Sequence, residues 1–283
     1  VLFKWHSLDH VSLDESYTKP PKNPKSPFDY FHINSIEVDE DSNLLVSARR
    51  TSTVYKIERN SGEVIWRLGG KRSDFEMGPG TRTAWQHDAR RQPDGTITIF
   101  DNGGVTKDEL SYGLVLELDE EKMRATLVRR YAHPDGRLAG TQGSMQVLPN
   151  GNVFIGWGSN PLLSEFSKDG ELLFNAAFPP GVESYRAFRS VWSAQPGDAP
   201  AVAADRAASE EKVTLYASWN GATEVATWEV LAGPNPEELE AVATAPREGF
   251  ETAITVNTAE PYVGVRARDY SGRVLGTSMP IQA

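Results

Sequence analysis

The chain has 283 residues, a formal net charge of −10 and no cysteine. The lack of cysteine excludes disulfides, thiolate metal sites and cysteine nucleophiles. The acidic balance argues against a nucleic-acid binder, which would normally carry a broad basic face. No apolar run approaches the roughly 20 residues that span a bilayer, and no signal peptide is visible.

Charge is distributed unevenly along the chain. The segment 49–91 holds ten Lys or Arg against five Asp or Glu, whereas residues 198–283 hold thirteen acidic and six basic residues. A cationic stretch in an acidic protein can hold a small anion. A loop-rich face with a few solvated arginines would give the same count, so charge alone leaves both interpretations open.

The first residues are apolar, and the chain opens with Val1 inside the run Val-Leu-Phe-Lys-Trp. A native start rarely falls within a strand, so we expect further chain to precede this segment. By its pattern, Val1–Trp5 matches the last strand of a repeat unit.

Three consecutive segments share one layout of four short strands rich in β-branched and aromatic residues, separated by polar turns. They begin near His32, His87 and Gln142, at intervals of 55 positions. Four antiparallel strands per repeat at this period are typical of a β-propeller blade. The absence of a sustained 3.6-residue period predicts few helices. A sandwich or barrel of short strands is the rival interpretation.

The sequence therefore predicts an all-β chain that begins with an incomplete β-propeller. Residues 1–195 would form about three full blades with broken blades at either end. Propellers typically need four to eight blades, so we expect missing blades from the same gene product or from a second chain to complete the ring.

The amino-acid composition and the repeat pattern change in the last third of the chain. Residues 196–212 are rich in Ala, Pro and Asp and are predicted to form a linker. Strands resume over 213–283, in an order that looks like a fibronectin type III β-sandwich with Trp219 as its core aromatic residue. A further propeller blade is the alternative for this segment.

Two histidines occupy equivalent positions in the repeat. The first strand of a blade lines the central channel, so neighbouring blades would bring His32 and His87 together although 55 residues separate them. Imidazole can act as a nucleophile or as an acid and base near neutral pH. Asn34, Gln86 and Gln142 lie at the same blade starts and could donate to an anion, although polar packing would explain them equally well.

Other residues near the blade starts are weaker candidates. Arg49, Arg72 and Arg90 could clamp an anion, and Trp85 and Trp157 could stack on an aryl group, although packing within the blades is the simpler role for the tryptophans. No residues show the spacing of metal ligands, and we expect no cofactor.

Two groups of ordered motifs stand out in the first two repeat units. The first is Tyr30–Ser35, read YFHINS, followed by LLVSAR. The second is Trp85–Ala89, read WQHDA, followed by Asp101–Gly103, read DNG. Together they resemble the arylsulfotransferase family, in particular its shorter actinobacterial and fungal branch, and the resemblance covers roughly residues 1–195.

The resemblance implies a six-bladed propeller in an exported protein. Family members move a sulfuryl group from an aryl sulfate ester to a phenol, without a nucleotide sulfate donor, so the implied partner is a small aromatic substrate. A channel histidine carries the group as a sulfohistidine, while other His and Arg residues hold its oxygens. As in phosphoryl transfer, negative charge spreads over three oxygens in the transition state, so fixed cations supply much of the catalysis.

Carried over to this sequence, the resemblance assigns His32 and His87 to two of the family's sulfate-contacting histidines. We predict these two residues to be catalytic. The predicted substrate- or anion-binding residues are Arg186, Asn34, Gln86, Arg90, Asn102 and Gln142.

The sequence departs from the family pattern at two points. Ser184 stands where the stretch Ser184–Ala187 would carry the nucleophilic histidine. The arginine expected after Asp-Asn-Gly is also missing, and Lys107 is the candidate to replace it. Either His32 or His87 then takes the nucleophile's role, or the scaffold serves another acid/base reaction such as cyclisation or isomerisation. A non-catalytic binding propeller is the third hypothesis.

Overall fold

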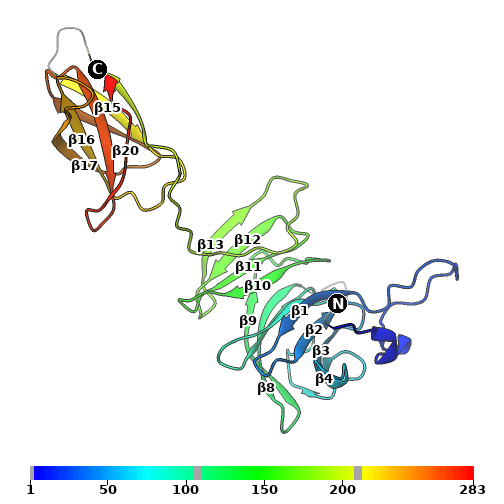
Figure 1. Cartoon of the computed structure of the whole chain (residues 1–283). Coiled ribbons are helices and arrows are strands. Elements are labelled where there is room, and N and C mark those ends of the chain that lie inside the picture. The colour runs from blue at the N-terminus through cyan, green and yellow to red at the C-terminus, as the bar shows by residue number, and fades with distance from the viewer. Residues whose placement is uncertain (1–2, 105–109, 207–211) are drawn as a thin grey trace. The chain divides into compact units, whose positions relative to one another are not determined.

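The computed structural model describes residues 3–104, 110–206 and 212–283 (Figure 1). Within them the chain is all-β, as predicted, with two short 3₁₀ helices, η1 (Ser7–Asp9) and η2 (Leu13–Glu15), as its only helices. It divides into two compact units, Val1–Arg189 and Ser190–Ala283. No helix in the described ranges is long and apolar enough to cross a membrane.

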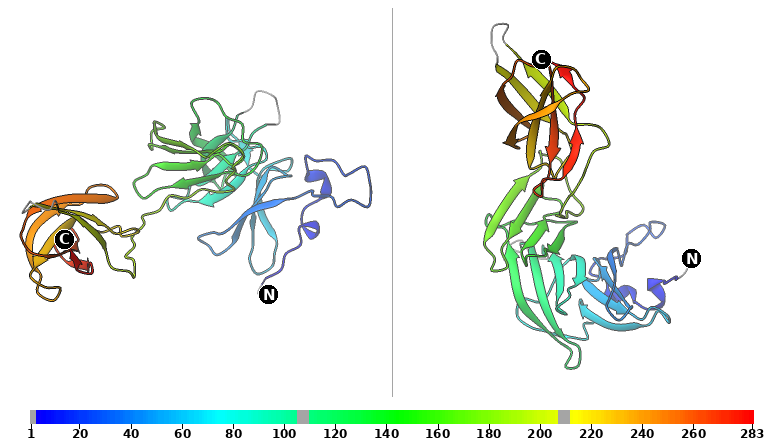
Figure 2. Two further views of the ribbon diagram at one scale, coloured as in Figure 1. Left: turned by 90° about the horizontal axis from the view of Figure 1, so that it is seen from above. Right: turned by 60° about the vertical axis from the view of Figure 1, so that its left-hand side comes forward.

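The first unit contains three sheets that follow one another along the chain (Figures 1 and 2). Sheet 1 consists of β1 (Ile33–Val38), β2 (Leu44–Ala48), β3 (Thr53–Ile57) and β4 (Val64–Gly69). Sheet 2 consists of β6 (His87–Arg91), β7 (Ile97–Asp101), β8 (Tyr112–Asp119) and β9 (Arg124–Ala132), with β5 (Glu76–Met77) parallel to β9. Sheet 3 consists of β10 (Ser144–Val147), β11 (Val153–Gly156), β12 (Leu162–Phe166) and β13 (Leu172–Ala177). Apart from β5, each strand is antiparallel to the next, as the repeat predicts.

Sheet 1 is covered on both faces, which explains why all five residues of β3 are buried. Alternate residues of a strand point to opposite faces. Val54 faces a core shared with sheet 2, and Tyr55 faces a second core formed with Val11 and Phe31 of the preceding segment. Full burial of an aromatic or branched side chain stabilises the fold by about 1.5–3 kcal/mol.

The expected strand at Val1–Trp5 does not appear over the described residues 3–5. A strand needs a neighbouring strand to bind its N–H and C=O groups. Residues 3–5 are instead attached to the unit through the side chain of Trp5. The indole Nε1 of Trp5 donates to the carbonyl oxygen of Gly62 at 2.9 Å. The Trp5 ring also stacks on His10, with 5.2 Å between ring centroids.

The first strands of the three sheets lie side by side: β1 contacts β6, and β6 contacts β10. Side-chain oxygens link these strands and the segment that follows sheet 3. In each link a side chain of one element accepts a hydrogen bond from the backbone N–H of the next, in the pairs Ser35–Ala89, Asp88–Met145 and Ser144–Ala187. The starts of the repeat units therefore meet, although about 55 residues of chain separate them.

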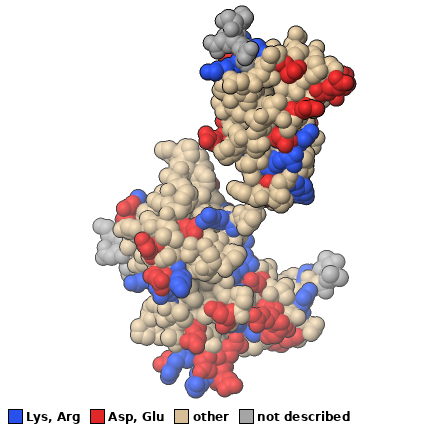
Figure 3. All heavy atoms as spheres, turned by 90° about the vertical axis from the view of Figure 1, so that its left-hand side faces the viewer, with Lys and Arg blue, Asp and Glu red and all other residues tan. Residues whose placement is uncertain are grey.

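Most cations of the segment 49–91 are paired with carboxylates inside this unit. The ion pairs include Lys56–Asp39, Arg67–Glu15, Arg72–Asp14, Arg90–Asp88 and Arg91–Asp39. On the face drawn in Figure 3, blue and red side chains are interspersed and no broad basic area is visible. Much of the local positive charge is therefore used in ion pairs that link parts of the first unit.

The second unit contains two antiparallel sheets around one core. One sheet has the order β14 (Ala201–Asp205), β15 (Lys212–Ser218), β18 (Glu251–Asn257). The other has the order β17 (Glu240–Pro246), β16 (Thr227–Gly233), β19 (Tyr262–Arg268), β20 (Val274–Thr277), and β21 (Ile281–Gln282) also pairs with β19. Both sheets contribute to the same hydrophobic cluster, which includes Trp219.

The structure differs from the predicted linker at 196–212. Ala201–Asp205 forms β14, which pairs with β15 along its whole length. Alanine and aspartate are poor strand formers, but pairing and burial override such preferences. The boundary between the two compact units falls at Arg189, a few residues before the predicted end of the propeller at residue 195.

Candidate active site

His87 is the first residue of β6, and the hydrogen bonds of its side chain are made by Nδ1. It is 3% exposed. Its Nδ1 lies 2.7 Å from the Oδ1 of Asn102 and 3.0 Å from the carbonyl oxygen of Trp85. Two acceptors face Nδ1, so this nitrogen carries the proton and Nε2 keeps its lone pair. Nε2 has no hydrogen-bond partner among the described residues.

The surroundings of His87 favour its neutral form. The pKa of His87 is lowered from 6.5 to about 4, chiefly by burial; the hydrogen bonds to Asn102 and Trp85 oppose this effect, and the nearby Arg49 and His32 add to it. At pH 7 the imidazole is therefore uncharged, with an available lone pair. This is the protonation state that a nucleophile or a general base requires.

Asn102 lies directly behind His87 and is fully buried. Its Nδ2 donates to the carbonyl oxygens of Ala139 and Gln142, both at 2.8 Å. These two bonds fix the orientation of the amide, so that Oδ1 must face the histidine. The sequence predicted Asn102 as an anion-binding residue, and the structure instead places it where it orients the His87 ring.

His32 precedes β1 and is also held through Nδ1. This atom lies 2.5 Å from the Oδ2 of Asp29, and the His32 side chain is 42% exposed. The pKa of the Asp29 carboxyl is lowered: partial burial raises it, but the hydrogen bond and charge of His32 and the contact with Arg50 outweigh that effect. An ionised carboxylate on Nδ1 orients the ring and leaves Nε2 for a substrate.

The two histidines share one electrostatic environment. Arg49 links them: its backbone N–H donates to the carbonyl oxygen of His32 at 2.9 Å, and its guanidinium lies 4.9 Å from the ring centroid of Trp85, two residues before His87. The charges of both Arg49 and His32 reach His87. The structure therefore brings the two predicted catalytic residues to the same region of the first unit.

Arg49 differs from the other two arginines proposed as anion ligands. Arg72 lies 3.0 Å from an oxygen of Asp14, and Arg90 lies 2.9 Å from an oxygen of Asp88. Arg49 donates from Nη2 to the carbonyl oxygen of Gly140 at 2.8 Å, and its Nε is enclosed without a partner. Within the described residues no carboxylate pairs with it, so its charge remains available to an anion.

Arg186 reaches back from the segment after sheet 3 to the starts of the first two sheets. Its Nη2 donates to the carbonyl oxygen of Asn34, and its Nε lies 3.5 Å from Oδ1 of Asp88. The neighbouring Tyr185 ring meets His87 edge-on, with 6.0 Å between centroids. Residues 185–186 therefore belong to the same region as the two histidines.

Ser184, at the position where the family resemblance places the nucleophilic histidine, has a local role in the structure. Its Oγ donates to the carbonyl oxygen of Arg186 at 2.9 Å. A hydroxyl whose proton is engaged in this turn is a poor nucleophile. Lys107, the candidate to replace the absent arginine, lies outside the described residues.

The remaining predicted residues connect neighbouring elements. Asn34 donates from Nδ2 to the carbonyl oxygen of Gln86 at 2.7 Å, and Gln86 donates in turn to Ser47, Ala48 and Thr53. Arg90 is held by Asp88 through Nε and Nη2. Gln142 donates to Glu183 at 3.1 Å. All four lie at the starts of the repeat units and are engaged in hydrogen bonds within the protein.

Sequence reasoning missed three residues of the site. Asp29 precedes His32 by three positions, and this spacing was the available signal for a carboxylate–imidazole pair. Asp88 is fully buried between the Arg90 and Arg186 guanidinium groups. Tyr185 stood inside a quoted motif, but only the folded chain shows that its ring contacts His87.

The fold and site together define a class: an all-β repeat protein with two oriented histidines and an arginine, Arg49, that has no carboxylate partner among the described residues, where its repeat units meet. The chain belongs to the arylsulfotransferase (ASST) family, whose model matches residues 1–179. No curated protein matches the chain.

Solved structures offer distant similarities. One is a protein of unknown function from Bacteroides caccae, with 14% identity and a TM-score of 0.37 over 89% of this chain and 88% of that one. Another is hydrazine synthase of Kuenenia stuttgartiensis, with 11% identity and a TM-score of 0.36 over 90% and 68%. A third is virginiamycin B lyase from Staphylococcus aureus, with 9% identity and a TM-score of 0.35 over 92% and 72%. Similarities this weak carry no argument about function.

Proposed function

We propose that this protein transfers a sulfuryl group from an aryl sulfate ester to a phenol, without a nucleotide sulfate donor. His87 is the nucleophile and His32 the acid and base. The observation that carries the proposal is the His87 imidazole, which is neutral at pH 7, fixed at Nδ1 by Asn102 and without a partner at Nε2 in the described part of the chain. Membership of the arylsulfotransferase family supports the same class of activity.

In the first step, the Nε2 lone pair of His87 attacks the sulfur of the aryl sulfate. The bond between sulfur and the phenolic oxygen breaks, and its electron pair leaves with that oxygen. Protonated His32 gives its Nε2 proton to the departing phenolate. The His87 ring becomes positively charged, and the acceptors on Nδ1, the Asn102 side chain and the Trp85 carbonyl, stabilise that charge.

In the second step, neutral His32 removes the proton of the acceptor phenol. The phenolic oxygen attacks sulfur, the bond between sulfur and Nε2 of His87 breaks, and His87 regains its lone pair. His32 is then protonated again, ready for the next donor. The Asp29 carboxylate balances the positive charge that His32 carries in each cycle.

Cations hold the sulfuryl oxygens while charge shifts between nitrogen and oxygen. Arg49 is the best placed, since it has no carboxylate partner in the described part of the chain and its charge reaches His87. Arg186 contributes from the other side, although Asp88 and Asn34 already hold part of its guanidinium group. Fixed donors of this kind are worth most in a site shielded from water.

We also propose the architecture of the whole protein: propeller blades in the first unit, a sandwich in the second unit, and export. The linked first strands of the three sheets support about three propeller blades. The free face of sheet 3, with a groove of about 550 Å³ that exposes Leu173, Phe174 and Phe188, supports missing blades that cover it. The shared core of the second unit supports a fibronectin type III-like sandwich, and the family resemblance supports export.

The test is incubation of the full chain with 4-nitrophenyl sulfate and a phenol, followed by detection of the sulfated phenol. Mass spectrometry of the protein after the donor alone should show one added SO₃ group, lost in His87→Ala. His6→Ala, which changes an exposed histidine, is the matched control. Sulfated product at the wild-type rate from His87→Ala would contradict the assigned nucleophile.

A second candidate is an acid/base reaction on a small metabolite, such as cyclisation or isomerisation. The replacement of the expected nucleophilic histidine by Ser184 favours it, since the His32–Asp29 pair would suffice for proton transfer. The mass-spectrometry experiment distinguishes the two functions. The acid/base candidate predicts that no SO₃ adduct forms in the wild-type protein and that no sulfated phenol appears.

A further inference from the structure

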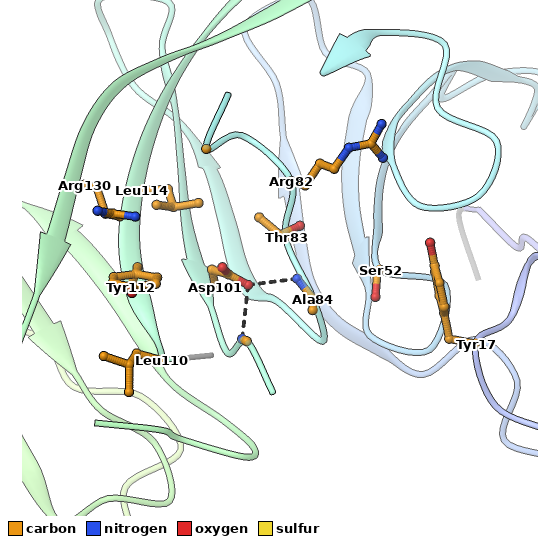
Figure 4. A pocket seen from close by; sticks show the side chains of 12 residues that line it. Tyr17, Ser52, Arg82, Thr83, Ala84, Asp101, Leu110, Tyr112, Leu114 and Arg130 are labelled. Carbon is orange, nitrogen blue, oxygen red and sulfur yellow. Dashed lines mark hydrogen bonds between the residues drawn. The ribbon is translucent and has the colours of Figure 1, made fainter. Parts of the chain in front are cut away.

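A pocket separate from the two histidines opens against sheet 2. Its volume is about 360 Å³ and none of the eight predicted site residues lines it. In Figure 4, Tyr112 and Arg130 stand on one side, Tyr17 and Arg82 on the other, and Asp101 between them. Pockets of roughly 300–1,000 Å³ are the usual size of small-molecule sites.

Two cations line this pocket without a carboxylate partner among the residues that the structure describes. They are Arg82, which belongs to the cationic segment 49–91, and Arg130 on β9; both are exposed. The Arg130 guanidinium lies 4.6 Å from the ring centroid of Tyr112, so an aromatic face fixes its position. The other arginines of β9 approach carboxylates, in the pairs Arg124–Glu76 and Arg129–Asp169.

The carboxylate of Asp101 in the pocket wall is hydrogen-bonded to the protein backbone. Asp101 is 8% exposed. Its Oδ1 accepts hydrogen bonds from the backbone N–H groups of Ala84 at 2.8 Å and Gly103 at 3.2 Å, drawn as dashed lines in Figure 4. These donors stabilise its charge locally, so the two arginines remain to attract an anion in a protein that is acidic overall.

The remaining pocket wall can accommodate a flat apolar group such as an aromatic ring. Leu110 and Leu114 line it together with the rings of Tyr17 and Tyr112. Guanidinium groups bind sulfonate and carboxylate oxygens while their planes stack on aromatic faces. The combination selects a ring that bears an acidic group.

We propose that this pocket binds a small aromatic molecule with one acidic group, such as a sulfonate or carboxylate, at a site distinct from His87. The acidic group is held by Arg130 or Arg82, and the ring lies against Tyr112 and Leu114. This binding site does not depend on the proposed sulfuryl transfer, because none of its residues takes part in that reaction.

The experiment is isothermal titration calorimetry of the full chain with 4-methylbenzenesulfonate, whose carbon–sulfur bond sulfuryl transfer does not cleave. The neutral comparator is 4-methylphenol. The variants are Arg82→Ala and Arg130→Ala, with Arg129→Ala as matched control, since the Arg129 side chain points to the opposite face of β9. All three arginines are at the surface, so these substitutions should leave the fold intact.

Saturable binding of the sulfonate to the wild type, weakened roughly threefold to tenfold in Arg82→Ala or Arg130→Ala and unchanged in Arg129→Ala and His87→Ala, supports the proposal. Binding of the phenol should be weaker than that of the sulfonate. Absence of saturable sulfonate binding overturns the proposal, as does wild-type affinity for the sulfonate in both Arg82→Ala and Arg130→Ala. Loss of binding in His87→Ala also overturns it, because the sulfonate would then occupy the histidine site.

Discussion

The Nδ1 of His87 lies 2.7 Å from the Oδ1 of Asn102, and the amide that accepts this bond is itself fixed by two backbone carbonyls. The imidazole can therefore adopt one tautomer, with its lone pair on Nε2. The reaction that we propose requires a neutral, oriented histidine ring, and the Asn102 amide supports that state through the nitrogen opposite the reacting one.

Replacement of Asn102 by Ala should slow sulfuryl transfer by about 10- to 100-fold, by analogy with the loss of an outer partner that orients a metal-bound histidine. The variant removes one of the two acceptors that fix the tautomer and orientation of the ring and leaves the Trp85 carbonyl, so the effect should fall on kcat more than on KM. Initial rates with 4-nitrophenyl sulfate measure both constants. Asn102→Asp is the informative second variant: a carboxylate beside Nδ1 should raise the pKa of His87, visible in an NMR titration. An unchanged kcat in Asn102→Ala would remove the assigned role.

Because of His87, the free energy of unfolding should decrease as the pH is lowered. Its pKa is about 4 in the folded protein against 6.5 ordinarily, so between these values the unfolded chain binds a proton that the folded chain does not. The free energy of unfolding must therefore decrease as the pH falls from 6.5 to 4, by about 3 kcal/mol at most. Urea unfolding at several pH values measures this. The decrease should be smaller in His87→Gln and unchanged in His6→Gln.

Arg49→Ala should lower kcat/KM by about 10- to 1,000-fold if its guanidinium holds the sulfuryl oxygens. Arg49→Lys should recover part of the rate, since it keeps the charge but not the planar donor group. The matched control is Arg72→Ala, because Arg72 lies in the same cationic segment and is paired with Asp14. Equal rates in Arg49→Ala and Arg72→Ala would exclude a special role for Arg49.

Asp88→Asn should destabilise the first unit by about 3 kcal/mol, because it leaves the charges of Arg90 and Arg186 without their buried partner. The variant also weakens the acceptor for the backbone N–H of Met145. Chemical denaturation followed by tryptophan fluorescence measures the change. Asp135→Asn, which alters an exposed carboxylate, provides the comparison and should stay within about 0.5 kcal/mol of the wild type.

The all-β class could be predicted because its signals are local. The turn at Pro93–Gly95 and the alternation of apolar residues along Ile97–Asp101 determine a hairpin whatever lies elsewhere in the chain. The same local logic failed at Ala201–Asp205, where a composition typical of a linker forms a strand because β15 offers it a partner. It also failed at Trp5, where the apolar pattern of a strand has no neighbouring strand to pair with.

The candidate site was predictable only in part. The period of the repeat indicated that His32 and His87 occupy equivalent positions, and the structure brings them into one electrostatic environment. The period could not indicate the partners of these residues. Asn102, predicted to bind an anion, is instead turned toward His87 by bonds to residues 37 and 40 positions away.

By itself, the sequence determined the all-β class, the length of the repeat and the residue types at the start of each repeat unit, because these depend on neighbours within a few positions. Tertiary structure alone decided which side chains meet. Arg186 reaches Asn34 across 152 positions, and Asp88 receives that same arginine because three sheets pack their first strands together. Such encounters depend on how separate sheets pack, which no local pattern records.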